Sequence, residues 1–176
     1  MPFDYESLVV SIPDFPKPGV VFKDITPVFA HAEAFASIID ELGSRFADKG
    51  ITKIVAAEAR GFMVASALAY RMQAGFVPAR KPGKLPRETY SKEFVLEYGT
   101  DSLEIHRDAL VPGDKVLIID DLVATGGTAQ AMVSLAEQAG AQVVGFGFFM
   151  ELAFLNPREA LAKISDAEVH SLFVVE

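Results

Sequence analysis

The sequence has 176 residues, 51% of them hydrophobic, which is enough for one domain of ordinary size with a substantial core. Its formal net charge of −8 argues against nucleic-acid binding, and the lack of cysteines excludes disulfides and thiolate metal sites. No apolar run approaches the roughly 20 residues that span a bilayer, and the N-terminus lacks a signal-peptide pattern. We therefore expect a cytoplasmic protein that acts without a membrane.

Taken in chain order, residues 1–30 come first, and four of the ten prolines lie in "SIPDFPKPGVVFKDITPVFA". This pattern predicts an irregular lid rather than a βα unit. Helical spacing or alanine-rich sequence then predicts helices over 34–46, 61–72 and 127–139. Short apolar runs predict buried strands at 53–57, 75–79, 115–120, 142–150 and 171–175. The alternation indicates an α/β fold with a mainly parallel central sheet flanked by helices, as a single domain over 1–176.

Residues 81–106 interrupt this rhythm with alternating apolar and polar residues around Gly99–Thr100–Asp101. The pattern predicts an antiparallel hairpin that turns at these three residues, and so long a polar excursion is typical of a functional loop. Seven of the sixteen lysines and arginines fall between Arg60 and Lys92. A local basic cluster in an acidic protein favours a small, highly charged anion as ligand.

Two adjacent carboxylates, Asp120 and Asp121, end the apolar run "VLIIDD" and are followed at once by "LVATGGT". Ligands of open parallel sheets bind at the carboxyl ends of the strands, so the pair is expected at the mouth of a site. A helix beginning near Gly127 offers free N–H groups to an anion, and Gly126 and Gly127 let the backbone curl around a phosphate. Carboxylates bind sugar hydroxyls or Mg²⁺, so a ribose 5-phosphate would satisfy both halves of the motif.

The whole constellation resembles the phosphoribosyl diphosphate (PRPP) signature of the type I phosphoribosyltransferases. Five further segments are similar, in the same order, to the adenine-specific branch of that family: "IPDFPKPGVVFKDITPV", "EARGF", "ARKPGKLP", "LEYG" and "LEIHRDAL". The similarity runs from about Ile12 to Leu152. It implies the type I phosphoribosyltransferase fold, with a small N-terminal hood over about 1–30 and a flexible β-hairpin loop over about 81–106. It also implies a homodimer that uses Mg²⁺ and converts adenine and PRPP to AMP and diphosphate in purine salvage.

The resemblance also implies roles for the residues that bind PRPP or AMP. Asp120 and Asp121 match the acids that bind the ribose hydroxyls and the water shell of Mg²⁺. The 5′-phosphate loop matches Ala124, Thr125, Gly126, Gly127 and Thr128. The diphosphate would contact Arg60 of "EARGF" together with the basic residues Arg80, Lys81 and Lys84. Positive charge around the leaving group fits the basic cluster noted above.

Three residues are implied to be catalytic: Glu97 as general acid/base, Tyr98 as the aromatic residue that helps to close the site, and Arg60 at the leaving group. For adenine, the backbone groups of Val21 and Lys23 would read the edge of the base. Phe22 would stack on one face, and Leu152 would lie on the other. The sequence departs from the family at Lys23, where arginine is common, and in "RGFMVAS", which lacks the usual aromatic-glycine pair.

Two alternatives stay open from the sequence. One is a phosphoribosyltransferase for another purine base, such as a 6-oxopurine. The other is a PRPP-binding regulator without catalysis, although such proteins usually carry a DNA-binding domain and the sequence shows no basic recognition helix. Glu97 and the complete hairpin favour an enzyme over a regulator.

Overall fold

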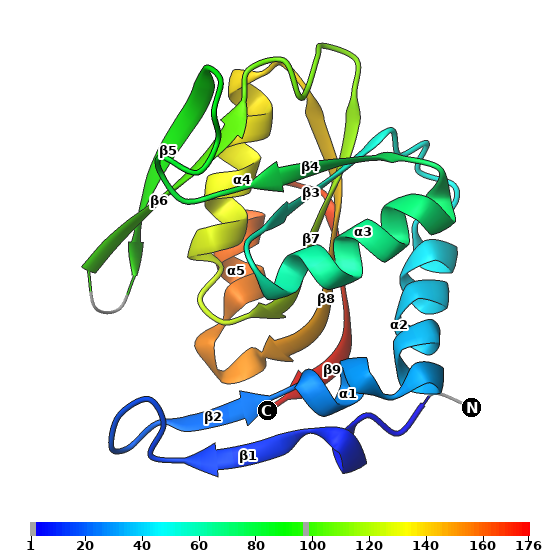
Figure 1. Cartoon of the computed structure of the whole chain (residues 1–176), viewed down its shortest axis with the longest axis vertical. Coiled ribbons are helices and arrows are strands. Elements are labelled where there is room, and N and C mark those ends of the chain that lie inside the picture. Colours follow the sequence, from blue (N-terminus) through cyan, green and yellow to red (C-terminus); the bar gives the residue numbers. More distant parts are fainter. Residues whose placement is uncertain (1–2, 97–98) are drawn as a thin grey trace.

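The structure, a computed structural model, describes residues 3–96 and 99–176. Figure 1 shows the arrangement of the chain, with the N-terminal segment lying below the central sheet. In chain order the elements are η1 (Glu6–Leu8), β1 (Val10–Pro13), β2 (Val21–Asp24), α1 (Thr26–Ala30), α2 (Ala32–Arg45), β3 (Lys53–Ala57), α3 (Arg60–Met72), β4 (Gly75–Ala79), β5 (Thr89–Leu96), β6 (Gly99–His106), β7 (Lys115–Val123), α4 (Gly127–Gln138), β8 (Gln142–Leu152), η2 (Ala153–Leu155), α5 (Pro157–Ala162) and β9 (Glu168–Val175).

The central sheet has five parallel strands in the order β4-β3-β7-β8-β9. The predicted α/β fold with a mainly parallel sheet is confirmed, and β3 and β4 have the predicted bounds. The other three strands are longer than predicted; β7, for example, runs on to Val123. Strand order reverses between β3 and β7, and ligands of such sheets bind at the reversal.

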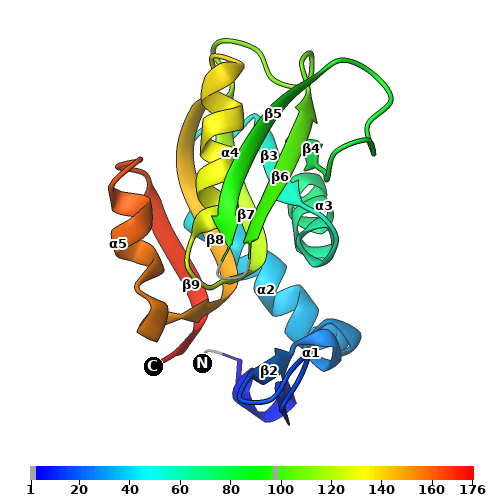
Figure 2. The ribbon, with the colours of Figure 1, turned by 90° about the vertical axis from the view of Figure 1, so that its left-hand side faces the viewer.

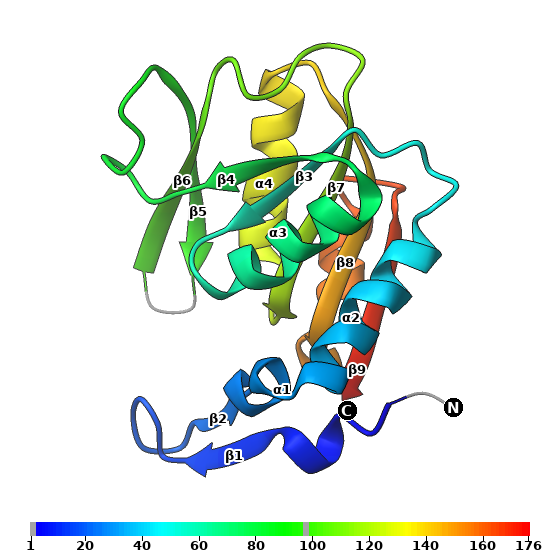
Figure 3. The ribbon, with the colours of Figure 1, turned by 45° about the vertical axis from the view of Figure 1, so that its right-hand side comes forward.

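Helices cover both faces of this sheet. Figure 3 shows α2 and α3 in front of the strands and α4 behind them. Successive residues of β3 point to opposite faces: Ile54 and Ala56 pack on the side of α2 and α3, whereas Val55 and Ala57 pack on the side of α4. Burial on both faces explains why these strands read as continuous apolar runs in the sequence.

Two glycines in β8 make room for helix α2. A Cβ atom on Gly145 would lie 2.7 Å from Cε1 of Phe46, and one on Gly147 would lie 2.7 Å from Cδ1 of Ile119 and 3.1 Å from Cδ2 of Leu42. Leu42 of α2 and Phe46, which caps the end of α2, are both fully buried. The missing side chains therefore allow α2 to approach the sheet closely.

Two small antiparallel sheets lie outside the central one. The β1–β2 hairpin belongs to residues 1–30, so the prediction of an irregular lid was wrong for part of this segment. Figure 1 shows this hairpin beyond the carboxyl ends of the central strands. The second hairpin, β5–β6, packs beside α4 (Figure 2) and confirms the hairpin predicted within 81–106.

The predicted turn of the second hairpin was wrong. Gly99, Thr100 and Asp101 lie in β6, where Gly99 pairs with Leu96 and Asp101 pairs with Phe94. The three residues predicted to form the turn are therefore strand residues. The alternation of apolar and polar residues predicts that two strands form, but it does not predict which residues of the two strands pair.

Helix α5 was not predicted, because six residues are too few to display a helical period. The departure "RGFMVAS" does not disturb α3, since Val64 and Ala65 are buried and Phe62 packs edge-on against Phe76 at 5.4 Å. In the described part of the chain, no helix has the length and apolarity needed to cross a membrane.

We expect Gly145→Ala to lower the free energy of unfolding by about 1–3 kcal/mol, because the new methyl group overlaps the buried Phe46 ring. Chemical denaturation measures this. Gln142→Ala, at the exposed start of the same strand, is the control and should change stability by less than about 0.5 kcal/mol. Equal stability of Gly145→Ala and the wild type would contradict the close packing of α2.

Candidate active site

The two adjacent acids lie in β7, near its carboxyl end. Asp121 is buried, with 6% of its surface exposed, and its backbone N–H donates to Oδ1 of Asp120 at 2.8 Å. Leu122 and Val123 continue the strand beyond them by pairing with β8. The backbone of the acids is therefore held by the central sheet, as expected for groups that must keep fixed positions in a site.

Residues at the start of α3 surround these acids. The Nε atom of Arg60 lies 2.8 Å from Oδ2 of Asp121, and its guanidinium lies 5.5 Å from the ring centre of Phe22. The next residue, Gly61, has no side chain, and a Cβ atom there would lie 2.8 Å from Oδ1 of Asp120. The β3–α3 turn thus supplies a counter-charge for Asp121 and leaves space for Asp120.

The pKa of Asp120 is raised well above its ordinary value. Burial is the main cause, and the negative charge of Asp121 is the second. Arg60 acts in the opposite direction but does not cancel these effects. A ligand that brings positive charge or hydroxyl donors to this pair would therefore lower the cost of ionising it.

A cavity of about 150 Å³ adjoins the acids. Its lining comprises Asp120, the complete turn from Ala124 to Thr128, and nearby apolar residues that include Leu96 of β5. Gly126 has a φ of +91°, which favours glycine, and α4 begins at the following residue. The free N–H groups of the first helical turn make this cavity suitable for a phosphate.

The basic residues near β4 are organised by Glu58. Its carboxylate accepts a hydrogen bond from the backbone N–H of Lys81 at 2.8 Å and lies 3.3 Å from Nε of Arg80. The Lys81 hydrogen bond is the largest cause of the lowered pKa of Glu58, ahead of Arg80. Lys84 is exposed and contributes a weaker attraction to Glu58. The side chain of Lys81 lies 3.2 Å from Asp101 on the hairpin.

The N-terminal hairpin presents one free backbone edge. Pro13 pairs with Val21 and Ser11 pairs with Lys23. Because Pro13 has no N–H, the Pro13–Val21 pair cannot exchange two hydrogen bonds. In an antiparallel ladder, hydrogen-bonded and non-hydrogen-bonded pairs alternate, so the Ser11–Lys23 pair, two residues along, is of the same kind as Pro13–Val21. The N–H and C=O groups of both Val21 and Lys23 therefore point away from β1.

Side chains of the same hairpin have different environments. Phe22 is partly buried and contacts Phe15 edge-on at 5.2 Å, and Nζ of Lys23 donates to Oγ of Ser11 at 2.7 Å. Leu152 ends β8 and packs, partly buried, against the core on the side of α2 and α3. The Lys23 side chain is thus occupied within the hairpin, while the backbone edge beside it is free.

The structure brings together Asp121, Arg60 and Phe22 by direct contact, and it places the 124–128 turn beside Asp120. Glu97 and Tyr98 lie outside the described residues. Sequence reasoning missed Glu58, although it directly precedes "ARGF". The sequence does contain a signal for this role, because a carboxylate that lies near two basic segments is expected to pair with one of them.

Within residues 3–96 and 99–176, no group of three or more His, Cys, Asp or Glu side chains could hold a metal ion by itself. Any divalent cation at this site would therefore need ligands from a bound substrate or from water as well as from the acid pair.

The family model of the phosphoribosyl transferase domain matches residues 22–171. The chain is 55% identical over 158 residues to the adenine phosphoribosyltransferase of Solidesulfovibrio magneticus, covering 90% of this chain and 92% of that one. Its fold matches the adenine phosphoribosyltransferase of Thermoanaerobacter pseudethanolicus with a TM-score of 0.92 and 48% identity over 98% of each chain. It also matches the Saccharomyces cerevisiae adenine phosphoribosyltransferase, complexed with D-2,5-dideoxy-2,5-imino-altritol 1,6-bisphosphate and adenine, with a TM-score of 0.88 and 38% identity over 96% of each chain.

We expect Asp120→Asn to raise the thermal midpoint by a few degrees at pH 7. The raised pKa means that ionising Asp120 costs folding free energy. That cost is absent below the ordinary pKa, where the carboxyl is protonated in both states. It grows as pH rises above the ordinary pKa and reaches its full size above the raised pKa. The difference between variant and wild type should therefore disappear in acid.

Asp108→Asn is the control for this measurement. Asp108 is exposed and pairs with Arg87, whose hydrogen bond is the main cause of its lowered pKa. Its replacement should not raise the midpoint at pH 7. A midpoint for Asp120→Asn that stays below the wild type at pH 7 would contradict the proposed cost of the buried acid pair.

Proposed function

The chain belongs to the adenine phosphoribosyltransferases, within the phosphoribosyl transferase domain family, and we propose that it transfers the 5-phosphoribosyl group from PRPP to N9 of adenine. The products are AMP and diphosphate, so the reaction is purine salvage by a pentosyltransferase. One observation carries the site assignment: the acid pair, of which Asp121 is buried and Asp120 partly buried, is followed directly by the turn and helix start that line the cavity with Asp120.

The ribose 5-phosphate part of PRPP is proposed to occupy this strand and turn. Asp120 and Asp121 accept hydrogen bonds from the 2′- and 3′-hydroxyls. The N–H groups and hydroxyls of Ala124, Thr125, Gly126, Gly127 and Thr128 hold the 5′-phosphate. Support comes from the cavity that these five residues and Asp120 line together, and from the helix start that favours an anion.

The diphosphate is proposed to leave toward the basic residues Arg60, Arg80, Lys81 and Lys84. As the bond from C1′ to the diphosphate breaks, negative charge grows on the leaving oxygens and positive charge grows on the ribose. The basic residues stabilise the first charge, and the nearby acids stabilise the second. The contacts of Arg60 with Asp121 and of Arg80 with Glu58 support this arrangement, because they hold the cations in place beforehand.

Asp120 and Asp121 are also proposed to face Mg²⁺ that arrives with PRPP. The acids fit such a cation, since carboxylates are hard oxygen ligands and since burial, followed by repulsion from Asp121, raises the pKa of Asp120. When bound, Mg²⁺ neutralises charge on the diphosphate. Because the acid pair alone is not a complete ligand set among the described residues, the pair would act mainly through water or the substrate.

Adenine is proposed to lie between Phe22 and Leu152, with its edge read by the backbone of Val21 and Lys23. The free edge of β2 supports this assignment, because the N–H and C=O groups of these two residues point away from β1. The contact of Phe22 with Arg60 places the stacking ring close to the leaving-group residues. A departing proton from N9 requires a base, and Glu97 is proposed for that role, with Tyr98 helping to close the site.

The remaining proposals concern organisation. We propose one phosphoribosyltransferase domain over 1–176, comprising a hood and a flexible hairpin, in a cytoplasmic homodimer. An exposed apolar groove on α3, lined by Met63 (42% exposed), Tyr70 and neighbouring residues of α1 and α2, supports self-association. The two alternatives, an enzyme for another purine base and a PRPP-binding regulator, are less well supported. Relatives at about 50% identity are named adenine phosphoribosyltransferases.

The test of the proposed function is a base panel. We expect diphosphate release with PRPP, Mg²⁺ and adenine, and a kcat/KM for adenine that exceeds that for hypoxanthine by at least about 10³. The reason is that adenine offers a donor at C6 and an acceptor at N1, whereas hypoxanthine offers the reverse, so a fixed backbone pattern suits only one of them. Guanine and orotate serve as further controls. Equal rates with adenine and hypoxanthine would contradict adenine specificity.

Two neighbouring substitutions separate backbone from side-chain recognition. Phe22→Ala should raise the KM for adenine about 10-fold or more, because base stacking on an aromatic ring is lost. Lys23→Ala, whose side chain bonds to Ser11, should change the KM by less than about threefold and keep the preference for adenine. Steady-state kinetics with both bases measures this. A loss of selectivity in Lys23→Ala would show that the side chain, and not the backbone, reads the base.

A further inference from the structure

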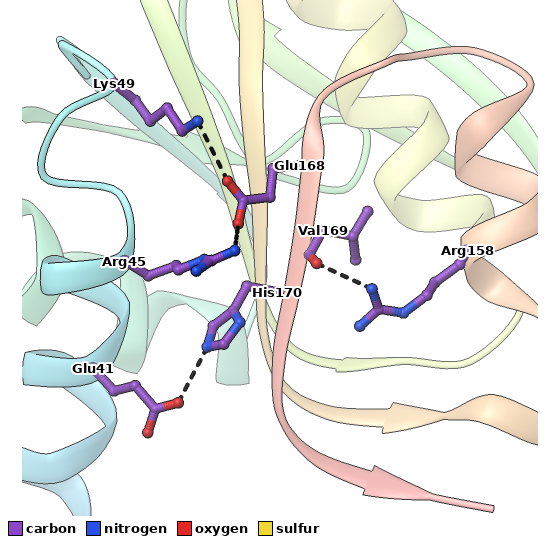
Figure 4. Close-up of polar contacts among 7 residues, drawn as sticks. All are labelled: Glu41, Arg45, Lys49, Arg158, Glu168, Val169 and His170. Carbon is purple, nitrogen blue, oxygen red and sulfur yellow. Dashed lines mark hydrogen bonds and ion pairs between the residues drawn. The ribbon is translucent and has the colours of Figure 1, made fainter.

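An ion pair between buried Glu151 and Arg158, whose side chain is 52% exposed, joins the end of β8 to α5. Glu151 is only 3% exposed. Its carboxylate accepts hydrogen bonds from Nε and Nη2 of Arg158, each at 2.9 Å. The third nitrogen, Nη1, donates to the carbonyl of Val169 in β9 at 3.1 Å (Figure 4). Burial raises the pKa of Glu151, but the Arg158 hydrogen bonds, the Ser171 hydrogen bond and the charge of Arg158 together leave the pKa below its ordinary value. The pair is therefore a charged, two-pronged connection.

Helix α5 forms the wall behind the 124–128 turn. The position where Gly126 would carry a Cβ atom lies 3.6 Å from Cβ of Ala160, 3.6 Å from the carbonyl oxygen of Pro157 and 3.8 Å from Cγ of Leu161. All three are residues of α5. If this short helix shifted, its residues would press on Gly126, the left-handed residue of the turn, or lose contact with it.

The ion pair also adjoins the other proposed wall of the site, which the β8–β9 ladder holds through the Leu152–Val175 pair. Glu151 is followed by Leu152, the residue assigned to one face of the adenine, and neighbouring side chains of a strand point to opposite sides. The Glu151–Arg158 pair closes the chain between these residues into a small loop. The segment closed by this pair therefore has Leu152 near its first end. Near its last end it has the α5 residues that pack against Gly126.

Helix α5 has few other attachments. It has six residues, too few to be stable alone, and Asn156 at its start makes no side-chain cap. Only Pro157 and Leu161 are buried, and one further hydrogen bond ties it to α4, from Nε2 of Gln130 to the carbonyl of Ala160 at 2.9 Å. Arg158 is thus the main polar restraint on the position of α5.

We propose that Arg158 is a positioning residue that holds the adenine wall and the 5′-phosphate turn at a fixed separation through Glu151. The proposal rests on the proposed function for the identity of the two ligands. Arg158 touches neither ligand and acts only through Glu151, Val169 and α5. Its loss is expected to weaken the binding of both substrates, while the acids and basic residues that act at C1′ stay unchanged.

The test compares Arg158→Gln with the wild type. We expect the KM for PRPP and the KM for adenine each to rise about 10-fold, with kcat changed by less than about threefold, because small displacements of positioning groups weaken productive binding. Amide hydrogen exchange at residues 124–128 should become faster. Arg158→Lys keeps the charge but loses the two-pronged geometry, so its KM values should also rise.

A double variant separates positioning from stability. Glu151→Gln combined with Arg158→Gln removes the unpaired buried charge, so its thermal midpoint should return toward the wild type while both KM values stay raised. Arg45→Gln is the matched control: Arg45 pairs with Glu168 on the opposite side of β9 (Figure 4) and should leave both KM values unchanged. KM values that recover together with the midpoint, or that do not rise in Arg158→Gln, would overturn the proposal.

Failure of the proposed function and failure of the proposed role of Arg158 give different results. If the wild type releases no diphosphate from PRPP and adenine, the proposed function is wrong. The hydrogen exchange at 124–128 and the affinity for ribose 5-phosphate, measured by calorimetry, would then still test Arg158. Unchanged exchange and unchanged affinity in Arg158→Gln would overturn the positioning role by themselves.

Discussion

Placing two adjacent carboxylates, Asp120 and Asp121, in the buried end of a central strand costs free energy that the surrounding residues have to offset. Arg60 does so for Asp121 at 2.8 Å, and Gly61 leaves the space that Asp120 occupies. Both are the first residues of α3, which follows β3, and β3 lies beside β7, so the strand order brings them to the acid pair. Phe22 then packs against Arg60, which connects the N-terminal hairpin to the acids. The position of each substrate-binding element is thus related to that of the acid pair.

Much of this arrangement could be predicted from sequence for a definite physical reason. Strand β3 is buried between its neighbours, and the edge strand β4 is partly buried, so both appear as short apolar runs with clear ends. The acid pair and the turn from Ala124 to Thr128 are contiguous, so their proximity needs no tertiary information. The roles of Val21, Phe22, Lys23 and Leu152 came from family resemblance, because nothing local distinguishes a stacking phenylalanine from one in the core.

The remaining features depend on contacts between distant segments. Prolines in residues 11–30 disguised the β1–β2 hairpin, although Pro13 occupies a position where an N–H is not needed. The turn between β5 and β6 was misplaced because register follows from cross-strand packing and not from glycine alone. The space left by Gly145 and Gly147 is taken by Phe46, which caps α2, and by Leu42 of α2, and nothing local in the sequence indicates this contact.

The N-terminal hairpin is a separate sheet that shares no strand pairing with the central one. Its ring contact with Arg60 joins it to the machinery around the ribose. Substitutions in β1 and β2 can therefore accumulate without disturbing the frame that carries the acids. Leu152, by contrast, belongs to a central strand and is bound to the same backbone as Glu151. In the proposed site, the Phe22 side of the base pocket therefore rests on a peripheral hairpin, whereas the Leu152 side is constrained by the packing of the core.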